Sequence, residues 1–259
     1  MKILEYKQCK NNIYEVTFEN GEKHKLYDDI ILKYELLIEK KVNDKTLKKI
    51  LEENEKMTAY YIALKYISIR MRSEKEIEAY LKKKNTDNAN IDYAIERLKK
   101  EKYINPDSYA QAYINDAINL SMYGPKKIED SLLKLGIEKS TIDKYISKID
   151  SEVWQDRIKK ILDKKSKINK NSASIFKKKM FSHLTNLGYN ISMINELLSN
   201  FKIDTSNAFI KEADKTWGLL ERKYSSKELI LRFKNKMFTK GFSTEEINSF
   251  IEKKTDKSF

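Results

Sequence analysis

The spacing of hydrophobic and polar residues changes once along the chain, near residue 28. Before that point apolar and polar side chains alternate, most clearly over residues 14–18. Alternation is typical of a half-buried strand, and Asn20-Gly21 is a favoured pair for a tight hairpin turn. Residues 2–8 can add a further strand. The pattern therefore predicts a small β-sheet and hairpin over residues 1–28.

From residue 29 onward the apolar residues recur three and four positions apart, which is the spacing of one face of an α-helix. The composition agrees, because only six Gly and two Pro interrupt the 259 residues. Lys, Glu, Leu and Ile, which helices tolerate well, are abundant. The sequence therefore predicts a helical connector over residues 29–56 and helices in the rest of the chain.

From about residue 57 the helical pattern repeats itself about every fifty residues. Four isoleucines mark equivalent positions, and apolar residues stand three and four positions after each of them: Ile91, Ile142, Ile194 and Ile247. Apolar pairs also stand ten and fourteen positions before each of them: Leu81 and Ile77, Leu132 and Ile128, Leu184 and Met180, Met237 and Phe233. This spacing places each group on one helical face.

A helix stop lies six residues before each isoleucine, at Asn85, Gly136, Gly188 and Gly241. Gly and Asn tolerate the left-handed conformation that ends many helices. The helix before each stop also has a start signal in three copies, which are predicted capping boxes at 73–76 and 225–228 and a helix-starting proline in Gly124-Pro125. With a further apolar helix upstream, each repeat is predicted to contain three helices.

The resulting fold prediction is a mainly α protein, with tandem three-helix repeats in an elongated array and a small N-terminal β-sheet. One such unit buries its apolar stripe poorly alone, so neighbours are expected to stack. The predicted repeats span residues 57–105, 106–150, 151–203 and 204–259.

The distribution of charge adds a partner class. Residues 1–56 carry 12 basic and 12 acidic residues, so the formal net charge of +13 lies entirely after them. The excess is densest over residues 159–179. A basic excess attracts polyanions, above all nucleic acid, although lysine-rich helices can also simply be solvated. A single cysteine, Cys9, and the absence of a long apolar run favour a cytoplasmic protein without a membrane partner.

Residues for catalysis are sparse. The two histidines, His24 and His183, have no second His or Cys at metal-ligand spacing, and no phosphate-binding glycine loop occurs. We therefore expect no enzyme, no metal and no cofactor. Aromatic residues accompany the basic segment, at Trp154, Phe176 and Phe181, but their spacing favours core positions over base stacking.

Three segments resemble the RecX family. Residues 63–77, with Arg-Met-Arg-Ser-Glu-Lys-Glu-Ile at their end, are similar to its first-repeat signature. Residues 103–110 are similar to its second helical entry. Residues 123–128, followed by Leu-Gly-Ile at 135–137, are similar to its Gly-Pro-Lys/Arg-x-Ile motif. The resemblance covers residues 57–150 strongly and 151–259 weakly, and Asn85 replaces the family's usual glycine.

The resemblance implies a non-catalytic regulator of homologous recombination and the SOS response. Members of the family bind RecA and the RecA–single-stranded DNA filament, and they inhibit its ATPase, strand exchange and co-protease activities. A monomer with possible direct DNA contacts is expected. The candidate contact residues are basic and lie near second-helix starts or in the basic segment: Arg70, Arg72, Lys126, Lys127, Lys159, Lys160, Lys164, Lys165, Lys177, Lys178 and Lys179.

Two other classes stay open on the sequence alone. One is a nucleic-acid-binding helical repeat protein that acts without RecA, and the other is a helical adaptor for another protein. Salt dependence separates them, because binding to phosphates weakens steeply as salt rises.

Overall fold

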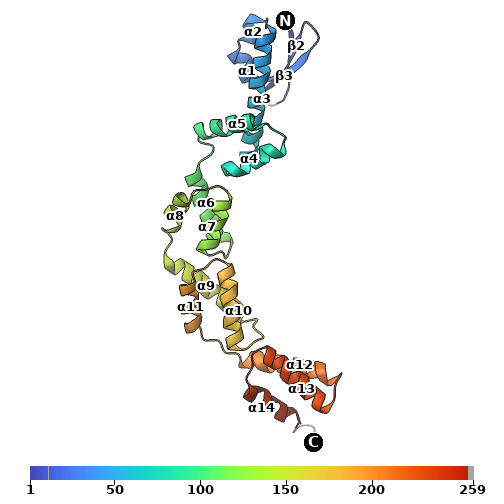
Figure 1. The fold of residues 1–259 in the computed structure, drawn as a ribbon, viewed down its shortest axis with the longest axis vertical. Coiled ribbons are helices and arrows are strands. Elements are labelled where there is room, and N and C mark those ends of the chain that lie inside the picture. Colours follow the sequence, from blue (N-terminus) through green and yellow to red (C-terminus); the bar gives the residue numbers. More distant parts are fainter. Residues whose placement is uncertain (11, 256–259) are drawn as a thin grey trace. The chain divides into compact units, whose positions relative to one another are not determined.

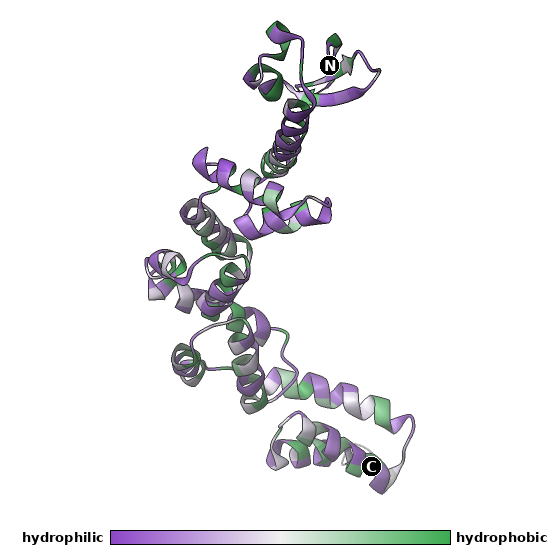
Figure 2. Cartoon of the chain, turned by 45° about the horizontal axis from the view of Figure 1, so that its top comes forward, coloured by the Kyte–Doolittle hydropathy of each residue, from purple (hydrophilic) through white to green (hydrophobic). Residues whose placement is uncertain are grey.

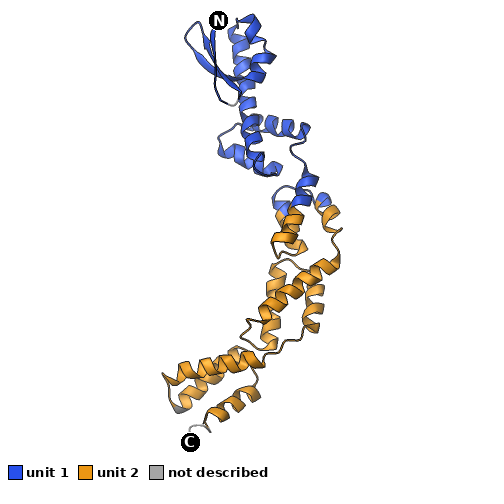
Figure 3. Ribbon diagram, turned by 180° about the vertical axis from the view of Figure 1, so that it is seen from behind, with its two compact units in different colours: residues 1–112, 132–141 blue, residues 113–131, 142–259 orange. Residues whose placement is uncertain are grey.

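The computed structural model describes residues 1–10 and 12–255. The chain divides into two compact units (Figure 3), of which unit 1 comprises Met1–Ala112 with Leu132–Thr141 and unit 2 comprises Tyr113–Ser131 with Ile142–Phe259. The described residues are mainly helical, with a single three-stranded sheet near the N-terminus (Figure 1), so the predicted fold class is confirmed.

The N-terminal sheet is antiparallel, with strand order β1 (Ile3–Gln8), β2 (Ile13–Phe18) and β3 (Lys23–Tyr27). The predicted turn joins β2 to β3, and Gly21 there has a φ of 85°. Val16, Phe18 and Leu26 on the inner face are fully buried. The sheet predicted from alternation is therefore confirmed.

A helix covers this sheet and continues into the first repeat. Two short helices, α1 (Asp28–Lys33) and α2 (Leu36–Glu39), precede the long helix α3 (Asp44–Ile67). The Asn54 side chain on α3 bonds the backbone of β3, accepting from the N–H of Tyr27 at 3.0 Å and donating to the carbonyl of Lys25 at 2.9 Å. The predicted boundary at residue 56 therefore falls inside one continuous helix.

The N-terminal segment and the first repeat also share a hydrophobic core. One cluster of buried residues runs from Ile3 in the sheet, through Ile50 and Ala63 on α3, to Ile91 and Leu98 in the first repeat. Because α3 contributes to both parts, removing residues 1–56 would cut this helix and expose the core of the first repeat. The N-terminal segment is part of the same packing unit.

The four repeats use equivalent helices in the predicted order. The first helices are α3, α6 (Pro106–Leu120), α9 (Ser151–Ser166) and α12 (Ser206–Glu221). The second are α4 (Glu74–Lys83), α7 (Pro125–Lys134), α10 (Ala173–Asn186) and α13 (Ser226–Thr239). The third are α5 (Asn88–Lys100), α8 (Lys139–Ile146), α11 (Ile191–Asn200) and α14 (Thr244–Thr255).

The apolar columns of the repeat are buried. The four marker isoleucines are at most 1% exposed, and the eight apolar residues at the paired positions of the second helices are buried as well. Their helices carry hydrophilic residues on other faces (Figure 2), as an amphipathic pattern requires. The residues three positions after the later isoleucines, such as Tyr145 and Leu197, are only half-buried.

The helix stops adopt the predicted left-handed backbone. The φ angles of Asn85, Gly136, Gly188 and Gly241 are 58°, 83°, 85° and 81°. The predicted starts agree in two cases and fail in one. Pro125 is the first residue of α7, and Ser73 forms a reciprocal capping box with Glu76 before α4. The box supplies acceptors for the backbone N–H groups of Ser73 and Glu76, which have no acceptor within the helix.

The capping box predicted at residues 225–228 is wrong. Ser225 precedes α13, but its side chain makes no capping hydrogen bond, and Glu228 instead accepts from Arg232 at 2.9 Å. A box that the sequence reading missed lies one helix later. There the Ser243 N–H donates to Glu246 at 2.8 Å, and the Glu246 N–H donates to the Ser243 hydroxyl at 3.2 Å.

The glycine stops also form junctions between repeats. In unit 2 the Gly124 N–H donates to the carbonyl of Leu187 at 2.7 Å, and the Lys126 N–H donates to the carbonyl of Gly188 at 3.0 Å. A Cβ atom on Gly188 would lie 2.3 Å from the backbone nitrogen of Lys127. A glycine is therefore required at position 188 for two reasons: its φ is positive, and the backbone of Lys127 approaches it closely.

The same junction recurs at other repeats. Between α13 and α10, the Ser172 N–H donates to the carbonyl of Lys240 at 2.9 Å, and a Cβ on Gly241 would lie 2.5 Å from the Ser172 hydroxyl oxygen. In unit 1 the corresponding junction is looser. A Cβ on Gly136 would lie 3.4 Å from the Cβ of Lys75, which is an ordinary contact distance. Each junction thus places a left-handed glycine on the first turn of the preceding repeat's second helix.

A buried arginine closes the end of α6. Arg157 on α9 is 7% exposed, and its guanidinium donates to backbone carbonyls of Ala117, Ile118, Ser121 and Tyr123. Helix C-terminal carbonyls lack intrahelical donors and attract cations. Hydrogen bonds to a charged group contribute about 1.5–3 kcal/mol each, so Arg157 is a structural cation and not a surface one.

Candidate protein and nucleic-acid interface

The two candidate arginines before α4 have different surroundings. Arg70 is exposed, and its Nη2 lies 2.9 Å from Glu76. The side chain of Arg72 is only 11% exposed, and its guanidinium lies 4.0 Å from the ring centroid of Tyr66. Arg72, although one of the candidate contact residues, is therefore largely enclosed by its neighbours. Arg70 is the better candidate for a surface contact.

Glu76 connects these residues to the next repeat. It accepts from the Ser73 N–H, from Arg70 and, at 2.8 Å, from the hydroxyl of Tyr109 on α6. Burial alone would raise the pKa of Glu76, but these hydrogen bonds and the arginines hold the pKa below its ordinary value. The carboxylate stays ionised and keeps the arginines at the start of α4.

The candidate lysines of the second repeat, Lys126 and Lys127, are exposed in the first turn of α7. Lys126 pairs with Glu129 at 3.2 Å and Asp130 at 3.1 Å, and these carboxylates raise its pKa. The Lys127 ammonium lies 6.0 Å from the ring of Tyr123. Two cations oppose the dipole at a helix start, but the local carboxylates offset part of that repulsion.

The basic cluster of the third repeat lies on two packed helices. On α9, Lys159 pairs with Asp156 at 3.3 Å, whereas Lys160 and Lys164 are exposed and form no ion pair with described residues. Lys165 on the same helix is partly buried. Burial and the charge of Lys165 together lower the pKa of His183 on α10, so this histidine is held neutral.

On α10 the three candidate lysines differ in the same way. Lys177 donates to the carbonyl of Ser199 at 3.3 Å, and Lys179 donates to the side chain of Asn171 at 3.1 Å. Lys178 is exposed and makes no ion pair within the described chain. Lys160, Lys164 and Lys178 are therefore the cations of this cluster that are most available to a partner. Their contact role stays a prediction.

The aromatic residues beside this cluster are part of the core. Trp154 is 5% exposed and Phe176 is 3% exposed. Buried rings at these positions cannot stack on a nucleic acid base without unpacking the repeat. The preference for core positions over stacking, made from spacing, is confirmed for these two residues.

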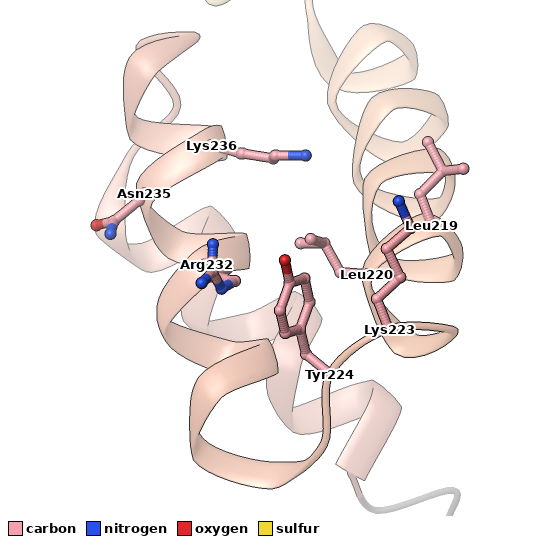
Figure 4. Close-up of a pocket in the computed structure, with 7 residues that line it drawn as sticks. All are labelled: Leu219, Leu220, Lys223, Tyr224, Arg232, Asn235 and Lys236. Carbon is pink, nitrogen blue, oxygen red and sulfur yellow. The ribbon is translucent and has the colours of Figure 1, made fainter.

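The sequence reading missed a basic pocket in the fourth repeat. It has a volume of about 390 Å³ and lies between α12 and α13 (Figure 4), lined by Leu219, Leu220, Lys223, Tyr224, Arg232, Asn235 and Lys236. The local signal for this pocket is Arg-Lys-Tyr at residues 222–224, two cations followed by an aromatic residue. This segment lies outside the densest basic segment of the chain.

Among the residues the structure describes, no group of three or more His, Cys, Asp or Glu side chains is arranged to hold a metal ion. Within the same residues, no helix combines the length and the apolar character that crossing a membrane demands.

Fold and surface together define a class: a basic, three-helix repeat protein with a small N-terminal sheet. Comparison with known proteins makes this specific. Residues 59–98 match the family model described as RecX, first three-helix domain. Over 257 residues the chain is 32% identical to a protein named Regulatory protein RecX from Streptococcus pneumoniae (strain Hungary19A-6), covering 97% of this chain and 98% of that relative. The chain belongs to the RecX family of regulatory proteins.

Solved structures agree with the fold. A crystal structure of regulatory protein RecX aligns with a TM-score of 0.67 at 22% identity, covering 77% of this chain and 100% of the other. A crystal structure of RecX from Lactobacillus salivarius aligns with a TM-score of 0.52 at 23% identity, covering 57% of this chain and 96% of the other.

Proposed function

We propose that this protein is a cytoplasmic, non-catalytic regulator of homologous recombination and the SOS response that binds RecA. It would bind the RecA–single-stranded DNA filament and inhibit its ATPase, strand-exchange and co-protease activities. Membership of a family of regulatory proteins supports this proposal, together with the exposed cations of the third repeat. A filament of protein and DNA is a polyanion, and exposed cations without ion pairs favour its approach.

Electrostatic attraction would mainly set the rate and the orientation of binding. Charges at the rim of an interface typically alter association rate and salt dependence, while buried contacts determine the dissociation rate. Lys160, Lys164 and Lys178 are the first candidates for this steering, followed by Arg70, Lys126 and Lys127. Arg72 is left out because its guanidinium is held against Tyr66 and Glu76.

The test is the ATPase activity of RecA on single-stranded DNA, measured with and without this protein. Wild-type protein should lower ATP turnover, and a variant with Lys160→Glu, Lys164→Glu and Lys178→Glu should lose most of that inhibition. A preparation of the protein without RecA should hydrolyse no ATP. Circular dichroism should show that the variant keeps the helical content of the wild type.

A charge-matched control lies in the neutral N-terminal segment. Lys7, Lys25 and Lys48 are exposed and form no ion pair with described residues, so reversing them changes the net charge equally. This variant should still inhibit RecA. If the two triple variants inhibit equally, the third repeat is not the steering surface. If wild-type protein leaves the ATPase unchanged, the proposed function is wrong.

A further inference from the structure

The pocket between α12 and α13 combines unpaired cations with apolar and aromatic walls. Figure 4 shows Leu219, Leu220 and Lys223 on one side, Arg232 and Lys236 on the other, and the Tyr224 ring between them. Leu220 is buried, whereas half of Leu219 is exposed. The walls therefore offer an apolar surface inside a rim of positive charge.

Two of the three cations at this pocket are uncompensated. Arg232 shares its charge with Glu228, whose carboxylate lies 2.9 Å from Nε. Lys223 and Lys236 are exposed, and neither forms an ion pair with any residue that the structure describes. The pocket thus carries a net positive charge that an anionic ligand could neutralise.

The aromatic wall is held in place by a cation. The guanidinium of Arg232 lies 4.2 Å from the ring centroid of Tyr224, and its Nε donates to the Glu228 carboxylate at 2.9 Å. Tyr224 is half-buried and lies three residues after Glu221, the last residue of α12. Both an aromatic ring and an arginine plane are surfaces on which an unpaired base can stack.

The first repeat shows how this opening can be closed. Tyr80 stands eleven residues before Ile91, as Lys236 stands eleven residues before Ile247. Tyr80 stacks on Tyr66 with ring centroids 3.9 Å apart, so aromatic rings fill the space between α3 and α4. In the fourth repeat the equivalent side chain is a lysine, and the space is an open pocket.

We propose that this pocket holds one nucleotide of single-stranded nucleic acid. Lys223 and Lys236 would bind the phosphate, and the base would lie against Tyr224, Arg232 and Leu219. The amide of Asn235 offers both a donor and an acceptor to a base edge. The inference deepens the proposed function, on which it rests for the source of the strand, the DNA of the recombination filament.

An acidic segment of a protein is the competing ligand. Carboxylates would satisfy the two lysines, but they would gain nothing from the exposed leucine or the aromatic ring. A nucleotide uses every wall of the pocket, because its phosphate is anionic and its base is flat and largely apolar. The composition of the pocket therefore favours nucleic acid.

The test uses the full chain, without RecA, and a fluorescein-labelled oligodeoxythymidine followed by fluorescence anisotropy over a range of salt. Tyr224→Leu should weaken binding about fivefold or more, because stacking on one aromatic ring contributes about 1–3 kcal/mol per base. Tyr224→Phe should restore it. Lys223→Gln with Lys236→Gln should reduce the salt slope by about 0.7, since each neutralised phosphate of a single strand contributes about 0.7 and both lysines bind the same phosphate.

Lys7→Gln with Lys25→Gln is the charge-matched control and should keep the wild-type slope and affinity. Equal losses in the control pair would mean that the strand binds a diffuse charge, and wild-type binding by the pocket variants would remove the pocket as its site. Displacement of the strand by polyglutamate at equal charge would identify an acidic-protein site and overturn the proposal. No binding by the wild type would also overturn it.

Failure of this inference is distinguishable from failure of the proposed function. The anisotropy experiment contains no RecA, whereas the ATPase experiment measures inhibition directly. A protein that inhibits RecA while its pocket variants bind DNA normally would keep the regulatory function and lose the nucleotide site.

Discussion

The second helix of the first repeat and that of the third repeat have the same role in the fold but differ at both ends. Helix α4 starts at a side-chain capping box and ends at Asn85, whose side chain is exposed. Helix α10 starts where the Ser172 N–H bonds the carbonyl of Lys240, and it ends at Gly188 against the backbone of the preceding repeat. Both helices have a side-chain cap at their start, because the Ser172 hydroxyl also accepts from the Ile175 N–H at 3.4 Å. What distinguishes α10 is that backbone atoms of neighbouring repeats contact it at both ends.

This difference explains which residue occupies each stop. Asn85 and Gly188 both have positive φ, so local conformation alone would accept either residue type. Only at Gly188 does another backbone approach so closely that a Cβ has no space. A glycine there joins repeats, whereas the asparagine at the first stop only has to end a helix.

The largest expected effect comes from filling the junction. Gly188→Val should lower the free energy of unfolding by about 3 kcal/mol or more, measured by urea denaturation. Placing a residue that has a Cβ in the left-handed backbone conformation costs about 1–2 kcal/mol, and overpacking adds about 1–3 kcal/mol. If the free energy of unfolding fell by no more than the cost of the positive φ alone, close backbone packing at Gly188 would be contradicted.

Gly21 provides the matched control for that variant. Its φ of 85° equals that of Gly188, but a Cβ there would meet nothing within 4 Å. Gly21→Val should therefore cost only the conformational part, about 1–2 kcal/mol. Equal losses at the two glycines would show that the junction has room for a side chain.

An intermediate effect is expected at the other end of α4. Arg72→Glu should destabilise the protein by about 2–4 kcal/mol, because it removes a largely buried cation from Tyr66 and puts a carboxylate beside Glu76. Arg70→Glu should cost about 1 kcal/mol at most, since its side chain is exposed. Thermal denaturation of both variants measures the difference, and similar melting temperatures would contradict these positions.

Local sequence signals predicted much of this fold. Periodicity located the helices, and the residue types at Asn85, Gly136, Gly188 and Gly241 located their left-handed ends. These features depend on neighbours a few residues away. The missed capping box at Ser243 and Glu246 carried the same local signature and could have been found, whereas the one expected at residue 225 had the signature without the hydrogen bonds.

Long-range contacts could not be predicted in this way. Nothing near Arg157 in the sequence indicates that it binds carbonyls more than thirty residues earlier. The same limit applies to the candidate site, because Arg72, one of the candidate contact residues, lies against Tyr66. The pocket at Tyr224 was missed because it forms only when α12 and α13 pack together.

The smallest expected effect is at the first stop. Asn85→Gly should change the free energy of unfolding by about 0.5 kcal/mol or less, because glycine relieves the left-handed strain at Asn85 but gains freedom in the unfolded chain. The reciprocal change, Gly241→Asn, should cost several times more, since its Cβ would meet the Ser172 hydroxyl at 2.5 Å. Urea denaturation of the two variants side by side measures this asymmetry. A large loss at Asn85 would mean that its side chain stabilises the first repeat, and a small loss at Gly241 would mean that the junction yields to a side chain. With the asymmetry as expected, the residues at these two stops, Asn85 and Gly241, report whether a neighbouring repeat packs closely against each stop.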